Sequence, residues 1–194
     1  MIMKPLIALI TMMVWPVIPM FWIPAHLFSS SLKKFGRLTY ILTGIAWLPV
    51  AYEIFSHRSL IFDHIVVMPG ILAIAGLFML FMGTLLHIWT GAILTPRGLI
   101  GIPEIIAPDE SRLMDKGPFA VIRHPTYLAH TIMFLGVFLY TGSIAVGILT
   151  LADFTVVNAV IMPIEERELL QRFGDSYRTY MSKVPRLIPR CRLK

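Results

Sequence analysis

The sequence has little charge and almost no cysteine. Charged residues make up 14% of the 194 positions, whereas soluble domains carry about 25%, so a chain surrounded only by water is not expected. Cys191 is the single cysteine, which excludes an intrachain disulfide. The sequence also lacks internal repeats, a Rossmann-type glycine fingerprint and any recognisable nucleic-acid-binding module. The net charge of +6 is therefore interpreted as a basic surface facing anionic lipid, and no nucleic-acid partner is expected.

Long apolar runs make up most of the chain. Hydrophobic residues form 57% of it, and a helix of about 20 mostly apolar residues crosses a bilayer. The sequence therefore predicts one all-α domain over residues 1–194, a polytopic integral membrane protein with about five transmembrane helices. The proline-rich first run is interpreted as a retained span, because no clear small-residue cleavage site follows it. The predicted spans cover residues 5–28, 38–55, 65–94, 125–141 and 144–164.

The basic residues predict the orientation of these spans. The link after the first span, the segment 95–124 and the tail 165–194 hold every lysine and arginine except Lys4 and Arg58. Basic residues collect on the cytoplasmic side of a membrane. With five spans, the segments 95–124 and 165–194 and the C-terminus are then expected in the cytoplasm, and the N-terminus outside.

A polar stretch at residues 117–127 separates two apolar runs. Arg123, His124 and Pro125 stand directly before a nearly apolar sequence. Proline disfavours the α region for the residue before it and suits the first position of a helix. We therefore expect His124 to be extended and a helix to begin at Pro125. Arg123 and His124 would then lie at a helix N-terminus, where backbone N–H groups favour an anion.

The last two spans should bring a second polar cluster to this helix mouth. They form an antiparallel hairpin that turns at residues 142–143. At about 1.5 Å per residue, Glu165 should lie only ~7–8 Å beyond the level of Pro125. The helix mouth and the Glu165–Glu166 pair are therefore expected to meet at one membrane edge. Taken singly, these residues have ordinary interpretations, as a snorkelling arginine and a solvated first helical turn.

The order and spacing of these motifs resemble those of a known family. In sequence, the motifs are Gly117-Pro118-Phe119, Arg123-His124-Pro125-x-Tyr127, an apolar hairpin, Glu165-Glu166, Phe173-Gly174-x-x-Tyr177-x-x-Tyr180 and Val184-Pro185-Arg186-x-x-Pro189. This pattern, over roughly residues 104–189, is similar to that of the isoprenylcysteine carboxyl methyltransferases. The first two spans carry no matching motif.

The resemblance implies a membrane-embedded methyltransferase that uses S-adenosylmethionine and releases S-adenosylhomocysteine. Its acceptor would be the carboxylate of an isoprenylcysteine or a similar lipophilic molecule, which enters from the bilayer and becomes a methyl ester. No obligate protein partner is evident. Carried over by position, the residues that would contact the cofactor are Glu104, Ser111, Arg112, Leu113, Met114, Phe119, His124, Pro125, Thr126, Tyr127, Glu165 and Glu166.

Methyl transfer to a carboxylate needs little catalytic machinery. A carboxylate is already ionised, so no general base is required, and a dry pocket favours a reaction in which opposite charges neutralise each other. Arg123 is the candidate catalytic residue, because its guanidinium can orient a carboxylate of the acceptor or of the cofactor. One position departs from the family. Ile161 stands where eukaryotic members have a substrate-associated arginine, one helical turn before the glutamate.

Three alternative functions stay open. Methyl transfer to a phospholipid or another lipid amine would need a proton acceptor, which Glu165 or Glu166 could supply. A purely structural membrane scaffold is the second alternative. No metal site is expected, because the polar residues inside the spans show no i, i+4 ligand spacing. The third alternative is a haem-binding membrane protein that uses two of His26, His87, His124 and His130.

Overall fold

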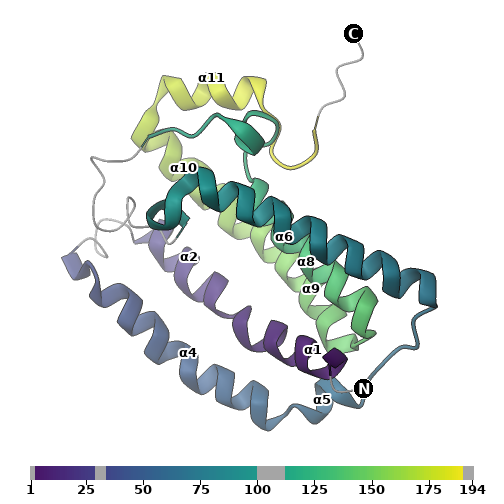
Figure 1. The fold of residues 1–194 in the computed structure, drawn as a ribbon. Coiled ribbons are helices and arrows are strands. Elements are labelled where there is room, and N and C mark those ends of the chain that lie inside the picture. The colour runs from purple at the N-terminus through teal and green to yellow at the C-terminus, as the bar shows by residue number, and fades with distance from the viewer. Residues whose placement is uncertain (1–2, 29–33, 100–111, 190–194) are drawn as a thin grey trace.

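The computed structural model describes residues 3–28, 34–99 and 112–189, and these residues form a helical bundle (Figure 1). A 3₁₀ turn, η2 (Gly117–Ala120), precedes α8, and a π-helical turn, η3 (Val157–Ile161), joins α9 to α10. The helices are α1 (Met3–Val14), α2 (Val17–Leu27), α4 (Leu38–Ser56), α5 (Ser59–Phe62), α6 (Gly70–Leu99), α8 (Pro125–Thr141), α9 (Ile144–Val156), α10 (Met162–Phe173) and α11 (Asp175–Lys183).

The chain is an all-α polytopic membrane protein. Within the described residues, four helical segments are long and apolar enough to cross a bilayer: Met3–Leu27, Leu38–Ser56, Gly70–Thr95 and Ile144–Phe173. A further helix, α8, has 17 residues, which is about 25 Å at 1.5 Å per residue. It packs against α6 and α9. Together these segments correspond, in order, to the five predicted spans.

The third span begins later than predicted. Residues 65–69 are not helical: Ile65 forms an isolated antiparallel bridge with Ser143, and the Val66 N–H donates to the Gly142 carbonyl at 2.8 Å. The physical reason is Pro69, because a proline holds the residue before it out of the α region. The predicted start at residue 65 is therefore wrong, and α6 begins at Gly70.

The first and fifth spans are not simple straight helices. The first is divided into α1 and α2 at Trp15 and Pro16, as its prolines lead one to expect. The fifth continues past its predicted end at residue 164, because α9 passes through η3 directly into α10. Pro163 lies in the first turn of α10. The missing N–H of a proline interrupts least at that position.

Two glycines let α6 and α8 approach closely. A Cβ added to Gly136 would lie 2.7 Å from the Gly76 carbonyl oxygen, and a Cβ added to Gly76 would lie 2.7 Å from the Gly136 carbonyl oxygen. Small residues allow membrane helices to pack backbone against backbone. This contact holds α8 against the longest helix. Figure 1 shows residues 112–124, which lead into α8, at the same end of the bundle as α11.

Replacing Gly136 by alanine is expected to destabilise the protein, because the added methyl group would collide with the α6 backbone. Overpacking of this kind typically costs about 1–3 kcal/mol. Gly44→Ala on α4 is the matched control, since a Cβ there meets nothing within 4 Å and alanine is the better helix former. Thermal unfolding in detergent should show a lower Tm for Gly136→Ala alone. An unchanged Tm for that variant would contradict the close packing.

Candidate functional site

A tight loop leads into α8. Gly117 has a φ of 58°, a left-handed conformation that glycine adopts without steric cost. The chain then passes through η2 to His124, which lies outside the α region at φ −122° and ψ 60°. Pro125 is the first residue of α8, which confirms the predicted helix start. We call residues 123–127 the α8 mouth.

The C-terminal loop, residues 184–189, holds this segment in place. The backbone N–H groups of Arg123 and His124 donate to the carbonyls of residues 185 and 186, at 2.9 and 3.2 Å. The Tyr180 hydroxyl donates to the Phe119 carbonyl at 2.6 Å. Burial raises the pKa of Tyr180 to about 12, so this hydroxyl keeps its proton and stays a donor at neutral pH.

Glu166 on α10 is the buried centre of the site. Its Oε1 accepts hydrogen bonds from Arg123 Nε at 3.0 Å, Arg123 Nη2 at 2.8 Å and His124 Nε2 at 3.1 Å. Arg186 donates to both of its oxygens, and this hydrogen bonding raises the pKa of Arg186 above its ordinary value. The Glu166 side chain is only 8% exposed. It therefore joins the α8 mouth, α10 and the C-terminal loop.

The guanidinium of Arg123 donates hydrogen bonds to other groups of the protein. Besides its bonds to Glu166, its Nη1 donates to the Val184 carbonyl at 2.7 Å and to the Met181 carbonyl at 3.3 Å. These contacts make Arg123 a link between α10 and the end of α11. The hypothesis that Arg123 orients a carboxylate of a cofactor or acceptor stays a prediction.

A cavity of about 260 Å³ lies beside this cluster, with walls from α2, α6, η2, α8 and α10. Phe119, His124, Thr126, Tyr127 and Glu165, all predicted cofactor contacts, line this one cavity. The described residues in its wall are Trp22, His26, His87, Leu94, Phe119, Arg123, His124, Thr126, Tyr127, His130, Glu165, Leu169 and Arg172. We call it the mouth cavity.

Several buried polar atoms of the mouth cavity make no hydrogen bond to any described residue. They include Glu165 Oε2, His87 Nδ1 and His130 Nδ1. The Glu165 oxygen lies 3.6 Å from His124 Nδ1, which is too long for a normal hydrogen bond. Buried polar groups in proteins are nearly always paired. The wall is therefore suited to a ligand, or to ordered water, that completes these bonds.

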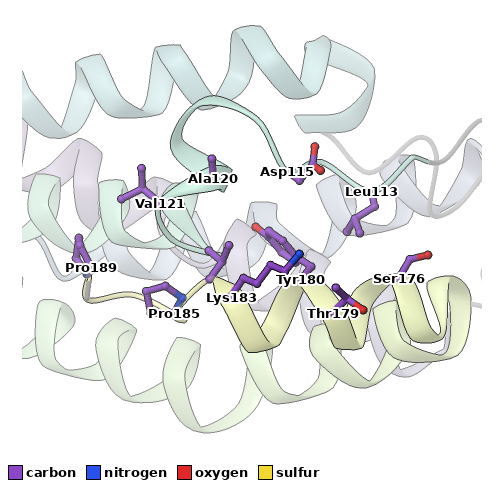
Figure 2. Close-up of a pocket in the computed structure, with 11 residues that line it drawn as sticks. Leu113, Asp115, Ala120, Val121, Ser176, Thr179, Tyr180, Lys183, Pro185 and Pro189 are labelled. Carbon is purple, nitrogen blue, oxygen red and sulfur yellow. The ribbon is translucent and has the colours of Figure 1, made fainter. Parts of the chain in front are cut away.

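A second and larger cavity lies on the other side of η2. Its volume is about 970 Å³, and residues 113–121, α11 and the C-terminal loop form its walls (Figure 2). Phe119 lines the mouth cavity, whereas its neighbours Ala120 and Val121 line this one. Leu113 is the one predicted cofactor residue among the described residues that line it. The predicted set is therefore divided between two cavities.

The other predicted cofactor residues do not line the mouth cavity within the described structure. Glu166 lies behind its wall, with its carboxylate bound as above, and Pro125 is buried in the first turn of α8. Arg112 is exposed and Met114 is half-buried. Glu104 and Ser111 lie outside the described residues.

Sequence reasoning missed the contribution of α2. His26 Nδ1 lies 2.8 Å from Glu168 Oε2 on α10, and the Trp22 ring stacks on His26 with centroids 5.3 Å apart. From the sequence, His26 is predicted only as a possible haem ligand, because no motif marks the first two spans. Its position within an apolar run could have indicated this contact. A histidine side chain facing lipid is energetically costly, so it is expected to face the interior of the bundle.

Known proteins match parts of this chain. The sequence profile of the phospholipid methyltransferase family matches residues 71–176, more than half of the chain. Methanethiol S-methyltransferase 1 of Bradyrhizobium diazoefficiens is 35% identical over 71 residues, which cover 37% of this chain and 24% of that protein. Cobalt-zinc-cadmium resistance protein CzcN of Cupriavidus metallidurans is 24% identical over 116 residues, 54% of this chain and 53% of that protein. The chain thus spans about a quarter and about half the length of these two relatives.

Replacing Glu166 by glutamine is expected to destabilise the fold, because it leaves Arg123 and Arg186 beside a neutral amide. Breaking a buried ion pair costs on the order of 3 kcal/mol. Asp175→Asn is the control, since its side chain is 92% exposed in a pair with Arg178 and surface pairs contribute little. Thermal unfolding in detergent should show a lower Tm for Glu166→Gln and an unchanged Tm for Asp175→Asn. Equal Tm values for that variant and the wild type would show that the cluster does not support the fold.

Proposed function

The chain belongs to the phospholipid methyltransferase family, and from that premise we propose that it is an integral-membrane methyltransferase that uses S-adenosylmethionine. The observation that carries this proposal is the mouth cavity, where a Glu165 oxygen without a hydrogen bond to any described residue lies in the same wall as the first turn of α8. S-adenosylmethionine supplies a methyl group on a positively charged sulfur.

The residues of the mouth cavity suit the chemical groups of this cofactor. The first N–H groups of α8 have no acceptor within the helix and favour a carboxylate. Glu165 Oε2 can accept from an ammonium group or a ribose hydroxyl. Trp22, Phe119 and Tyr127 offer aromatic surface for a purine ring and for a sulfonium. The methionine part of the cofactor carries a carboxylate and an ammonium group. The helix N-terminus suits the first, and the Glu165 carboxylate in the same wall suits the second.

The acceptor is proposed to be a lipophilic molecule that reaches the mouth cavity from the bilayer. An apolar groove of about 300 Å³ lies between α2 and α4, and its wall includes Phe21, Gly44 and Trp47. Trp22 lines both this groove and the mouth cavity. A hydrocarbon tail in the α2–α4 groove could therefore bring its headgroup into the mouth cavity.

Two classes of acceptor headgroup suit this arrangement. The carboxylate of an isoprenylcysteine is supported by the motif spacing, but Ile161, at the place of a substrate-associated arginine, is buried in an apolar cluster with Tyr127 and Met162. A phospholipid amine is supported by the family match. The likeness to a methanethiol S-methyltransferase supports a thiol, which belongs with the amine in one class because both lose a proton on methylation. The family match favours methyl transfer over the haem-binding and scaffold alternatives.

The α8 mouth is proposed to face the cytoplasm. Arg123, Arg172 and Arg186 lie at this end of the bundle, in or beside the mouth cavity. Arg58 lies at the start of α5, and Figure 1 shows α5 at the opposite end from α11. Since basic residues collect on the cytoplasmic side, the C-terminus would lie in the cytoplasm and the N-terminus outside.

The wild-type protein in detergent is expected to bind S-adenosylhomocysteine in a calorimetric titration. Glu165→Gln should weaken this binding about tenfold or more, because a hydrogen bond to a charged group contributes about 1.5–3 kcal/mol. Its Tm should stay at the wild-type value, unlike that of Glu166→Gln. Glu53→Gln, with a carboxylate that is 68% exposed on α4, is the control and should bind normally. Absence of binding by the wild type would reject the cofactor.

Filling the α2–α4 groove should affect long-chain acceptors selectively. Gly44→Phe adds a ring where a Cβ meets nothing within 4 Å. Methyl transfer to a long-chain acceptor should fall about tenfold, since each buried methylene that is displaced costs about 0.8 kcal/mol. Transfer to a short-chain acceptor with the same headgroup should stay near the wild-type rate, as should both rates in Gly44→Ala. An equal loss for both chain lengths would rule out the groove as the tail site.

A further inference from the structure

Two histidines from different helices face each other in the wall of the mouth cavity. His87 on α6 and His130 on α8 both line it, and their ring centroids are 4.9 Å apart with an interplanar angle of 38°. The Nδ1 atom of each ring is buried and has no hydrogen-bond partner among the described residues. Because buried polar atoms are normally paired, this pair indicates a place where a polar group of a ligand is received.

The pair lies away from the charged α8 mouth. His130 comes five positions after Pro125, which is about 7–8 Å further along α8. Its ring neighbours are aromatic, with centroids of Phe134 at 6.2 Å and Tyr127 at 6.5 Å. Glu165 lies beside His124, at the helix N-terminus. The charged amino-acid group of the cofactor is suited to the mouth end, which leaves the histidine end for the acceptor.

The other bases near the cavity are engaged or belong to the mouth end. Glu166 accepts from two arginines and from His124, so its lone pairs are in use. His26 Nδ1 lies 2.8 Å from Glu168 Oε2, where α2 meets α10. Glu165 lies 3.6 Å from His124 at the α8 mouth. A neutral imidazole keeps one nitrogen lone pair that can take up a proton, and the His87–His130 pair offers such lone pairs at the acceptor end.

We propose that the His87–His130 pair accepts the proton that the acceptor loses, so that the acceptor is a protic nucleophile, an amine or a thiol, and not a carboxylate. An N–H bond of the acceptor's ammonium form, or the S–H bond of its thiol, breaks and the proton moves to an imidazole lone pair. The electron pair left on nitrogen or sulfur bonds the methyl carbon. The bond from that carbon to the donor sulfur breaks, and its electron pair neutralises the sulfonium. This inference rests on the proposed methyltransferase function.

The test compares asparagine variants on protic and carboxylate acceptors. Asparagine keeps an amide near the place of Nδ1 but cannot take up a proton. In the double variant His87→Asn/His130→Asn, kcat for a phosphatidyl amine or a long-chain thiol should fall at least about 100-fold, with KM within about threefold. Each single variant should lose less. Any transfer to N-acetyl farnesylcysteine, the carboxylate arm, should be unaffected.

Binding of S-adenosylhomocysteine separates this inference from the function on which it rests. All the asparagine variants should bind it as the wild type does, which also shows that they are folded. A wild type that binds no S-adenosylhomocysteine would overturn the proposed function itself. A wild type that binds it and methylates only the carboxylate acceptor would overturn the histidine assignment and leave the cofactor site intact.

A second measurement does not use turnover. In ¹⁵N-histidine spectra of the protein with S-adenosylhomocysteine, adding the amine or thiol lipid should shift the resonances that are missing from His87→Asn and His130→Asn. His57, exposed at the end of α4 and paired with Glu53, is the internal control and should not respond. The proposal is overturned if the two resonances stay in place, if the double variant keeps its kcat, or if protic and carboxylate acceptors lose transfer equally.

Discussion

The buried carboxylate of Glu166 is the interaction on which the rest of the site depends. It binds Arg123 and His124 from the α8 mouth and Arg186 from the C-terminal loop. A carboxylate buried to this extent is tolerated only with its counter-charges in place. The mouth, α10 and the C-terminal loop therefore need one another to form. The same contacts hold together the α8 mouth and α10, which form part of the wall of the mouth cavity.

Two adjacent glutamates of similar chemistry have different environments. Glu166 has its oxygens filled by protein donors, whereas Glu165 lines the mouth cavity with one oxygen that no described residue bonds. The first is suited to holding the fold and the second to holding a ligand. The apolar helices contribute by close packing, since Gly76 and Gly136 let the backbones of α6 and α8 lie against each other. Packing of the apolar helices thus positions a small polar site at one end of the bundle.

Features that depend on distance along the chain could be predicted from the sequence. The lengths of the two hairpin helices predicted that Glu165 would lie near the level of Pro125. His124 lies 3.6 Å from Glu165 and 3.1 Å from Glu166, which confirms that the two polar clusters meet. Which glutamate turns inward could not be predicted, because it depends on which side of α10 faces α8. The His26 pair with α10 was also out of reach, because packing between distant helices leaves no local pattern.

The π-helical turn η3 decides the rotational phase of α10. A π turn holds one residue more than an α-helical turn, and each residue advances about 100° around a helix axis. Everything after Ile161 is therefore rotated by about 100° from its place in an uninterrupted α-helix. In such a helix Glu165 would take the angular position that Glu166 holds now, and Ile164 would take the position of Glu165. The extra residue thus gives the helix two useful carboxylates at successive positions, one for the fold and one for the cavity.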